Sequence, residues 1–256
     1  MIAVGVLGAS GRMGATVCEA VAVDPTLELV AAVDTHNAGQ VCADITVVDD
    51  REALVKASTE VVVDFTVANA ARENLPWVAQ QGMHAVVGTT GFSEADLVYL
   101  QEVYEAAGRV CVVAPNFAIS AVLMMRFAEI AAPYFDTAEV VEFHHDAKID
   151  APSGTARLCV EKMAAASRQW APDPTTNEIL PGVRGGSGAA DIRVHAVRMR
   201  GMVAHHEVIL GAEGQTLTIR QDSMDRSSFM PGVLAAIKAA PSHSGLIVGL
   251  EGVLNL

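Results

Sequence analysis

The residues best suited to acid–base chemistry are grouped in one short segment near the middle of the chain. His144, His145 and Lys148 stand within five consecutive positions. Hydride reduction leaves a carbon or nitrogen atom that must take up a proton, and both imidazole and ammonium groups can supply one when they are positioned. Their charge also stabilises negative charge that develops on the acceptor. The segment therefore predicts a site for reduction coupled to proton donation.

A candidate anion site follows directly. Ser153, Gly154 and Thr155 begin a predicted helix after a proline-containing turn. Backbone N–H groups, two hydroxyls and the helix dipole converge there, which suits a carboxylate. The structural alternative is an ordinary helix cap that binds no ligand.

A metal site is a competing interpretation of the two adjacent histidines. Zinc sites commonly need three or four ligands, and adjacent residues of a strand point to opposite faces. We therefore expect no metal. The same parity places Glu142 and His144 together on one face of a strand from Glu139 to His144, and we expect this face to point away from the core.

The N-terminal end carries a candidate cofactor site. An apolar run from Ile2 to Leu7 leads into a glycine-rich turn that opens a helix, the place where a dinucleotide pyrophosphate rests on backbone N–H groups. The spacing is Gly-x-x-Gly-x-x-Gly, so the motif is weak alone, and a turn without a ligand is the alternative. The candidate contacts are Gly8, Ala9, Ser10, Gly11, Arg12 and Met13.

Asp34 ends the second predicted strand, where an acid can accept hydrogen bonds from the adenosine ribose hydroxyls. Thr35, His36 and Asn37 follow it, so no adjacent Arg or Lys is present to bind a 2′-phosphate. We therefore expect NADH or NADPH as cofactor, with NADH favoured. An acid that caps a turn is the structural alternative, and Arg12 leaves NADPH possible.

Two further segments follow strands directly. Ligands of parallel α/β sheets bind at the carboxyl ends of the strands, so these segments are candidates for the nicotinamide side of the cofactor. They comprise Gly88, Thr89 and Thr90, and Ala114, Pro115, Asn116 and Phe117.

The predicted helices and strands that must position these residues follow two different patterns along the chain. Up to about residue 113, short β-branched runs alternate with helical stretches, which predicts parallel βαβ units in a doubly wound Rossmann-type sheet. The predicted elements are Ile2 to Leu7, Met13 to Ala22, Leu27 to Val33, Val61 to Phe65, Ala68 to Gln81, Ala85 to Val87, Glu94 to Ala107 and Val110 to Val113.

After Asn116 the pattern becomes typical of an α+β domain. Helices are predicted from Ile119 to Ala131 and from Thr155 to Gln169. Alternating runs at 192–198, 205–210 and 216–221 predict antiparallel strands. We predict a dinucleotide-binding domain from residues 1–117 and 228–256, and an inserted substrate-binding domain from residues 118–227.

Composition excludes several classes. The chain has 256 residues and a net charge of −13, and it lacks a basic stripe, so nucleic acid is an unexpected partner. Its longest apolar stretch is too short to span a membrane. The four cysteines form no Cys-x-x-Cys pair and are expected to be reduced, in a cytoplasmic protein.

The run from His144 to Thr155 resembles the signature of the dihydrodipicolinate reductases of bacterial lysine synthesis, now called 4-hydroxy-tetrahydrodipicolinate reductases. Further blocks match that family in the same order, so the resemblance covers essentially the whole chain. They are Val4 to Gly14, Val63 to Thr66, Gly88 to Gly91, Ala114 to Phe117 and Arg220 to Gly232.

The resemblance implies an NAD(P)H-dependent reduction, with loss of water, of a small cyclic dicarboxylate in diaminopimelate and lysine biosynthesis. It implies that His144 and Lys148 donate protons, that His145 contacts the substrate, and that Gly154 and Thr155 hold a carboxylate. It also implies a homotetramer assembled through the sheets of the inserted domain. Two rivals are a protein that senses NAD(H) without catalysis and a dehydrogenase for another keto or imino acid.

Overall fold

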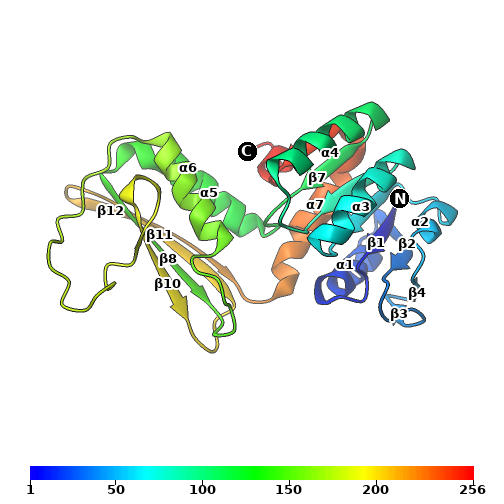
Figure 1. Ribbon diagram of the computed structural model, residues 1–256, viewed down its shortest axis with the longest axis horizontal. Helices are drawn as coiled ribbons and strands as arrows, with labels where there is room; N and C mark the ends of the chain where they lie inside the picture. Colours follow the sequence, from blue (N-terminus) through cyan, green and yellow to red (C-terminus); the bar gives the residue numbers. More distant parts are fainter. The chain divides into compact units, whose positions relative to one another are not determined.

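The computed structural model describes residues 1–256 and divides into two compact units (Figure 1). Met1–Phe117 and Arg226–Leu256 form the first unit, and Ala118–Asp225 form the second. Both chain ends therefore belong to the first unit. Each unit has its own sheet and its own helices.

The first unit contains an eight-stranded sheet in the order β13-β7-β6-β5-β1-β2-β4-β3. All its pairings are parallel except that of β3 with β4 at the edge. The strands are β1 (Ile2–Leu7), β2 (Leu27–Val33), β3 (Val41–Cys42), β4 (Ile45–Val48), β5 (Val61–Asp64), β6 (His84–Val87), β7 (Val110–Val113) and β13 (Gly245–Val248). The doubly wound class predicted from sequence is confirmed.

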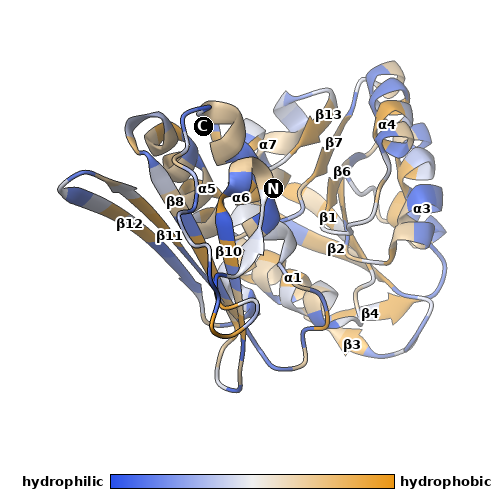
Figure 2. Cartoon of the chain, turned by 60° about the vertical axis from the view of Figure 1, so that its left-hand side comes forward, coloured by the Kyte–Doolittle hydropathy of each residue, from blue (hydrophilic) through white to orange (hydrophobic).

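Helices explain why these strands are apolar on both faces. Against one face, α3 (Ala68–Gln80) and α4 (Glu94–Ala107) contribute Leu75, Val78 and Tyr104 to the core. Elsewhere α1 (Arg12–Val23) packs against α7 (Met230–Ala239). Figure 2 shows mainly hydrophobic central strands, with hydrophilic residues along α3 and α4. The remaining helices are α2 (Glu52–Lys56) and α8 (Glu251–Leu254).

The second unit is a five-stranded sheet in the order β12-β11-β8-β10-β9, covered on one face by α5 (Ile119–Ala131) and α6 (Gly154–Ala166). Met125, Cys159 and Met163 from these helices pack against Val140 and Val208 of the sheet. The strands are β8 (Thr137–His144), β9 (Gly186–Ser187), β10 (Arg193–Arg198), β11 (Ala204–Ala212) and β12 (Gln215–Ser223).

One predicted strand of this sheet is antiparallel to only one of its two neighbours. The segment 192–198 was expected to be antiparallel, but β10 is antiparallel only to the two-residue β9 and runs parallel to β8. The chain returns from β8 to β10 through α6 and a long loop, and a crossover of this kind brings a strand back in the parallel direction. The expected antiparallel pairing holds for β11 with β12, and β11 is also antiparallel to β8.

Most predicted elements are found within a few residues of their expected bounds, and five short strands and α-helices were missed. Three of them, β3, β4 and α2, lie between residues 41 and 56, and the other two are β9 and α8; each has two to five residues. Segments this short carry too little periodicity to be recognised. Ala43 and Asp44, which join β3 to β4, both have positive φ angles.

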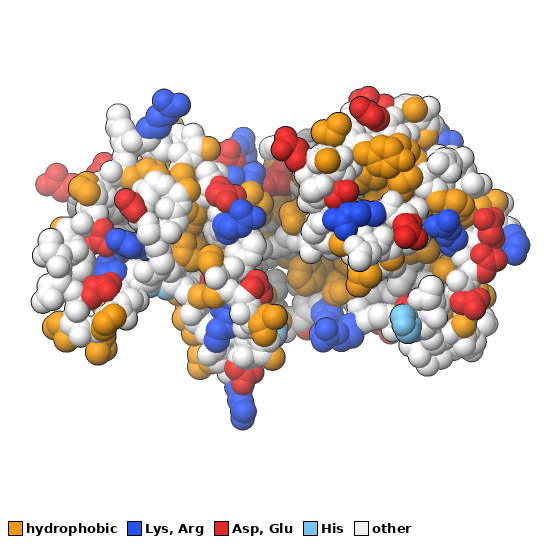
Figure 3. Space-filling view, in the orientation of Figure 1, with side chains coloured by type: hydrophobic (Ala, Val, Ile, Leu, Met, Phe, Trp, Pro, Cys, Tyr) orange, Lys and Arg blue, Asp and Glu red, His pale blue; other side chains and the backbone are white.

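The surface carries both signs of charge. In the face shown in Figure 3, basic side chains are interspersed with acidic ones. No helix of the structure combines enough length with enough apolar character to cross a bilayer.

The turn between β1 and α1 depends on close backbone packing. A Cβ atom at Gly14 would stand 2.0 Å from the carbonyl oxygen of Gly8 and 2.9 Å from Cα of Ala9. We therefore expect Gly14→Ala to lower the free energy of unfolding by about 3 kcal/mol, measured by urea denaturation. Gly186→Ala is the control, because its Cβ would meet only the Val194 carbonyl oxygen at 3.9 Å. Equal midpoints for the two variants would contradict this account.

Candidate active site

The end of β8 holds two functional side chains on the face that α5 and α6 cover. Glu142 is fully buried and His144 is 9% exposed, on the same face as the core residue Val140. The expectation that this face points away from the core is wrong. The placement of Glu142 and His144 on one face was inferred correctly from strand parity, but alternation alone does not say which face a helix covers.

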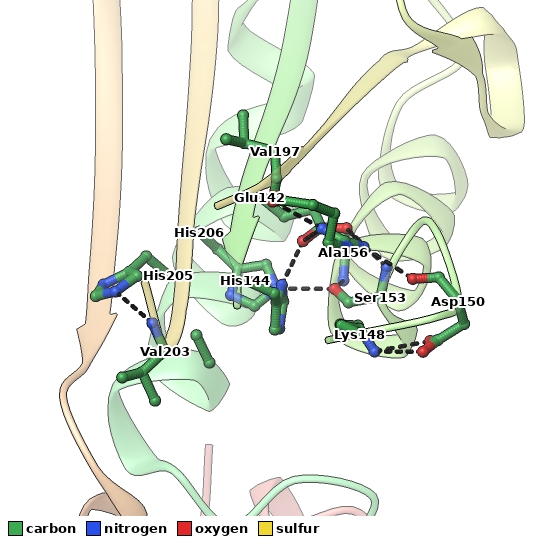
Figure 4. A network of polar contacts seen from close by, with 12 residues as sticks. Glu142, His144, Lys148, Asp150, Ser153, Ala156, Val197, Val203, His205 and His206 are labelled. Atoms are coloured by element: carbon green, nitrogen blue, oxygen red, sulfur yellow. Dashed lines mark hydrogen bonds and ion pairs between the residues drawn. The ribbon is translucent and has the colours of Figure 1, made fainter. Parts of the chain in front are cut away.

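Glu142 joins the parts of this site. Its carboxylate accepts two hydrogen bonds from Arg198, at 2.9 Å from Nη1 and 2.7 Å from Nη2, and one from the Ser153 backbone N–H at 3.1 Å. It also bonds Nδ1 of His144 (Figure 4). Burial raises the pKa of Glu142, but hydrogen bonds from His144 and Arg198 outweigh this effect and lower it to about 2. Glu142 is therefore an ionised carboxylate at neutral pH.

Lys148 lies beyond the end of the strand. Its Nζ donates to the Asp150 carboxylate at 2.7 and 2.8 Å, and this hydrogen bond lowers the pKa of Asp150. An ammonium group has three N–H donors, so one remains for a ligand. His145 is exposed, whereas the Lys148 side chain is only 19% exposed.

Ser153 begins α6. Its Oγ accepts from the Ala156 backbone N–H at 3.2 Å as the helix N-cap, which the sequence predicted as the structural role. A Cβ atom built at Gly154 would meet no atom within 4 Å, so the backbone there borders open space. An anion can therefore approach the first turn of this helix.

Three residues of this site were missed from the sequence, two of them buried and the third, Arg198, partly exposed. They are Arg198 on β10, His206 on β11 and Gln221 on β12. In the paired strands, Arg198 stands opposite His144 and His206 stands opposite Glu142. Gln221 stands opposite His206 on its other side. The His206 and His144 rings meet edge to face with centroids 5.4 Å apart. The only signal in the sequence is their alternation within predicted strands, which does not give register.

In the first unit, the candidate cofactor residues follow the carboxyl ends of neighbouring strands. Gly8 has a φ of +78°, and α1 begins after Gly11 with no side-chain cap and no acid in its first turn. The first N–H groups of α1 thus lack a side-chain partner from a capping residue, and the turn is open to an anion.

Asp34 is hydrogen-bonded to the glycine turn. Its Oδ2 accepts from the backbone N–H and the hydroxyl of Ser10, at 3.0 and 2.6 Å, and its Oδ1 accepts from the His36 N–H at 2.9 Å. Burial opposes ionisation, but these hydrogen bonds outweigh it and lower the pKa of Asp34. The carboxylate borders a pocket of about 530 Å³ that Gly8, Gly11 and Thr66 also line.

The other two candidate segments lie further along the same sheet edge. Thr89, Thr90 and Pro115 line a separate hollow of about 150 Å³. A Cβ atom at Gly88 would overlap the Phe65 ring at 2.0 Å, and that ring packs against Phe117 at a centroid distance of 6.0 Å. Gly88 and Phe117 thus shape the edge by packing. Neither pocket is lined by Ala9, Ser10, Arg12, Met13, Ala114 or Asn116.

These features fit a dinucleotide. A helix N-terminus without a side-chain cap suits the pyrophosphate, and an ionised acid beside a pocket at the end of β2 suits the ribose hydroxyls. No group of three or more His, Cys, Asp or Glu side chains is arranged to hold a metal ion.

Comparison with known proteins covers the whole chain. Residues 2–117 match the family model for the dihydrodipicolinate reductase N-terminus, and residues 120–254 match the model for its C-terminus. A protein of Corynebacterium urealyticum named 4-hydroxy-tetrahydrodipicolinate reductase is 50% identical, with 100% of both chains covered. One of the same name from Cutibacterium acnes is 47% identical, again with 100% of both covered.

A solved structure agrees. The dihydrodipicolinate reductase from Paenisporosarcina sp. TG-14, described with dipicolinate bound, superposes with a TM-score of 0.90 at 37% identity, covering 98% of this chain and 99% of that one. The resemblance inferred from sequence motifs is confirmed. This chain belongs to the dihydrodipicolinate reductase family.

Proposed function

We propose that this protein reduces 4-hydroxy-tetrahydrodipicolinate to tetrahydrodipicolinate, with loss of water, in the diaminopimelate route to lysine. The observation that carries the proposal is the buried Glu142 carboxylate, which bonds both His144 and the backbone of Ser153. It places a proton-donating imidazole beside a helix N-terminus suited to a carboxylate. Full-length identity to relatives that carry this name supports the same reaction.

In this mechanism the second unit binds the substrate and supplies protons. Ser153, Gly154 and Thr155 hold one substrate carboxylate at the start of α6, and His145, the exposed residue that follows β8, contacts the substrate. His144 and Lys148 donate protons. Since Glu142 bonds Nδ1 of His144, the other ring nitrogen, Nε2, is the one that exchanges a proton with the ligand.

The cofactor is held by the first unit. A reduced nicotinamide dinucleotide supplies hydride when bound. The first turn of α1 holds the pyrophosphate, and Asp34 accepts from the ribose hydroxyls. The residues that line the dinucleotide in this proposal are Gly8, Ala9, Ser10, Gly11, Arg12, Met13, Asp34, Gly88, Thr89, Thr90, Ala114, Pro115, Asn116 and Phe117.

We further propose that NADH is preferred to NADPH. An ionised Asp34 repels the 2′-phosphate of NADPH, and the next residues, Thr35 and His36, supply no permanent positive charge.

The open face of the five-stranded sheet supports a homotetramer. Val141, Phe143, Val197 and Ile209 lie on the face opposite α5 and α6, and none is fully buried within the chain. Copies of the chain that pair through this face would cover these side chains.

The reaction and the two proton donors are tested together. In a mixture of synthase, pyruvate and aspartate semialdehyde, we expect oxidation of the reduced nucleotide, followed by its absorbance. His144→Ala and Lys148→Ala should each lower kcat by about two to four orders of magnitude, because each removes a proton donor. Arg200→Ala is the control, since that nearby cation is 93% exposed and pairs only with Asp146.

No turnover by the wild type would favour an NAD(H)-sensing protein or a dehydrogenase for another substrate. Near wild-type kcat in both alanine variants would refute the assigned roles.

Asp34→Asn tests cofactor choice. The amide keeps the shape of the side chain but removes its charge, so we expect the ratio of kcat/KM for NADPH over NADH to rise about tenfold or more. Glu28→Gln removes an exposed acid from β2, the strand that precedes Asp34, and should leave the ratio unchanged. An unaltered ratio in Asp34→Asn would show that this charge does not set the preference.

Glu142 also makes stability depend on pH. Its pKa is about 2 when folded against an ordinary 4.5, so its stabilising effect is complete above about pH 4.5 and is lost as the pH falls toward 2. The effect is about 3 kcal/mol.

We expect Glu142→Gln to lower the free energy of unfolding by about that amount at pH 7, and to lose less stability than the wild type between pH 5 and pH 3. Urea denaturation at several pH values measures both. Parallel pH profiles for the two proteins would contradict the assignment.

A further inference from the structure

Two buried polar side chains behind Ser153 have no part in the proposed reaction. His206 is 2% exposed and Gln221 is 5% exposed, and they pair across β11 and β12. Buried polar groups are costly unless their hydrogen bonds are satisfied, so the direction of each bond here is constrained.

The orientation of the Gln221 amide follows from its neighbours. The Ala204 carbonyl oxygen can only accept, so the Gln221 atom that meets it at 3.3 Å is Nε2. The hydroxyls of Ser120 and Ser223 donate to Oε1 at 3.2 and 3.3 Å. The second N–H of Nε2 therefore donates to Nδ1 of His206, 3.2 Å away.

This orientation fixes the His206 proton. Because Nδ1 accepts, the neutral ring carries its proton on Nε2, which lies 3.0 Å from Oγ of Ser153. Burial, assisted by the neighbouring His144, lowers the pKa of His206 to about 4, so the ring is neutral at physiological pH. With the proton on Nδ1 instead, two N–H donors would face each other across the contact with Gln221.

Ser153 receives two hydrogen bonds as a result. Its Oγ accepts from Nε2–H of His206 and from the Ala156 backbone N–H. A hydroxyl oxygen has two lone pairs, so both are occupied, and only its own proton remains to form a bond.

We propose that His206, oriented by Gln221, is a positioning residue that makes the Ser153 hydroxyl an obligate hydrogen-bond donor. A group at the start of α6 must then accept, which selects a carboxylate and disfavours an ammonium or other donor. The inference rests on the proposed function in one respect, that Ser153 faces the substrate carboxylate.

The tautomer is tested in the wild-type protein without any ligand. Long-range ¹⁵N–¹H spectra of histidine-labelled protein distinguish the two neutral tautomers, and the His206 signals are those missing from His206→Leu. We expect the Nε2–H form throughout pH 5 to 8. The Nδ1–H form, or protonation within this range, would overturn the proposal.

A double-mutant cycle tests the action through Ser153, with pyridine-2,6-dicarboxylate (dipicolinate) as the probe and calorimetry as the measurement. We expect Ser153→Ala and His206→Leu each to weaken binding about tenfold, as for the loss or misorientation of a hydrogen bond to a charged acceptor. The double variant should bind within about twofold of Ser153→Ala, because His206 acts only through that hydroxyl. If instead the fold-losses of affinity in the two single variants multiply in the double variant, His206 has a general structural role.

The control for the lost helix cap is Ser93→Ala, which removes the N-cap of α4 in the first unit and should leave dipicolinate binding unchanged. Turnover in the synthase-coupled mixture judges the proposed function separately. If the wild type turns over substrate but the losses of dipicolinate affinity in Ser153→Ala and His206→Leu are independent, only the role of His206 is refuted. A wild type that binds no dipicolinate refutes the carboxylate assignment, whatever the tautomer.

Discussion

The second unit depends on how a single buried carboxylate is neutralised. Glu142 has no exposed surface, and an isolated charge in such a position would cost several kcal/mol. Four donors meet it: two from Arg198, one from the Ser153 backbone and one from the His144 ring. These donors come from β10, from the start of α6 and from β8 itself. The requirement to satisfy one charge therefore holds three elements in fixed relation.

The same requirement explains why the reactive groups are rigid. His144 is hydrogen-bonded at Nδ1 to Glu142, and its ring packs edge to face against His206. Ser153 donates its backbone N–H to Glu142, and its hydroxyl oxygen is hydrogen-bonded to His206 and Ala156. Lys148 differs, because its partner Asp150 is largely exposed and the pair lies outside the strand. The site thus combines an imidazole fixed by buried contacts with a cation on a turn.

Sequence patterns predicted much of this molecule, for identifiable reasons. Long periodic segments such as α4 and α5 were placed at their observed bounds, and the glycine turn and the His144 to Thr155 block located both candidate sites. Arg198, His206 and Gln221 could not be found in this way, because they approach Glu142 and His144 only through strand register. The covered face of β8 was also misassigned, because a charged pair at a strand end resembles a solvent-facing pattern.

The hairpin between β11 and β12 has a consequence for which changes the chain can tolerate. Its two-residue turn, Glu213-Gly214, fixes the register that sets Gln221 opposite His206. Side chains alternate between the faces of a sheet, so an insertion that shifted the register by one residue would move one of these partners to the open face. A length change at this exposed tip, several residues along both strands from the substrate site, would therefore alter chemistry rather than loop shape alone.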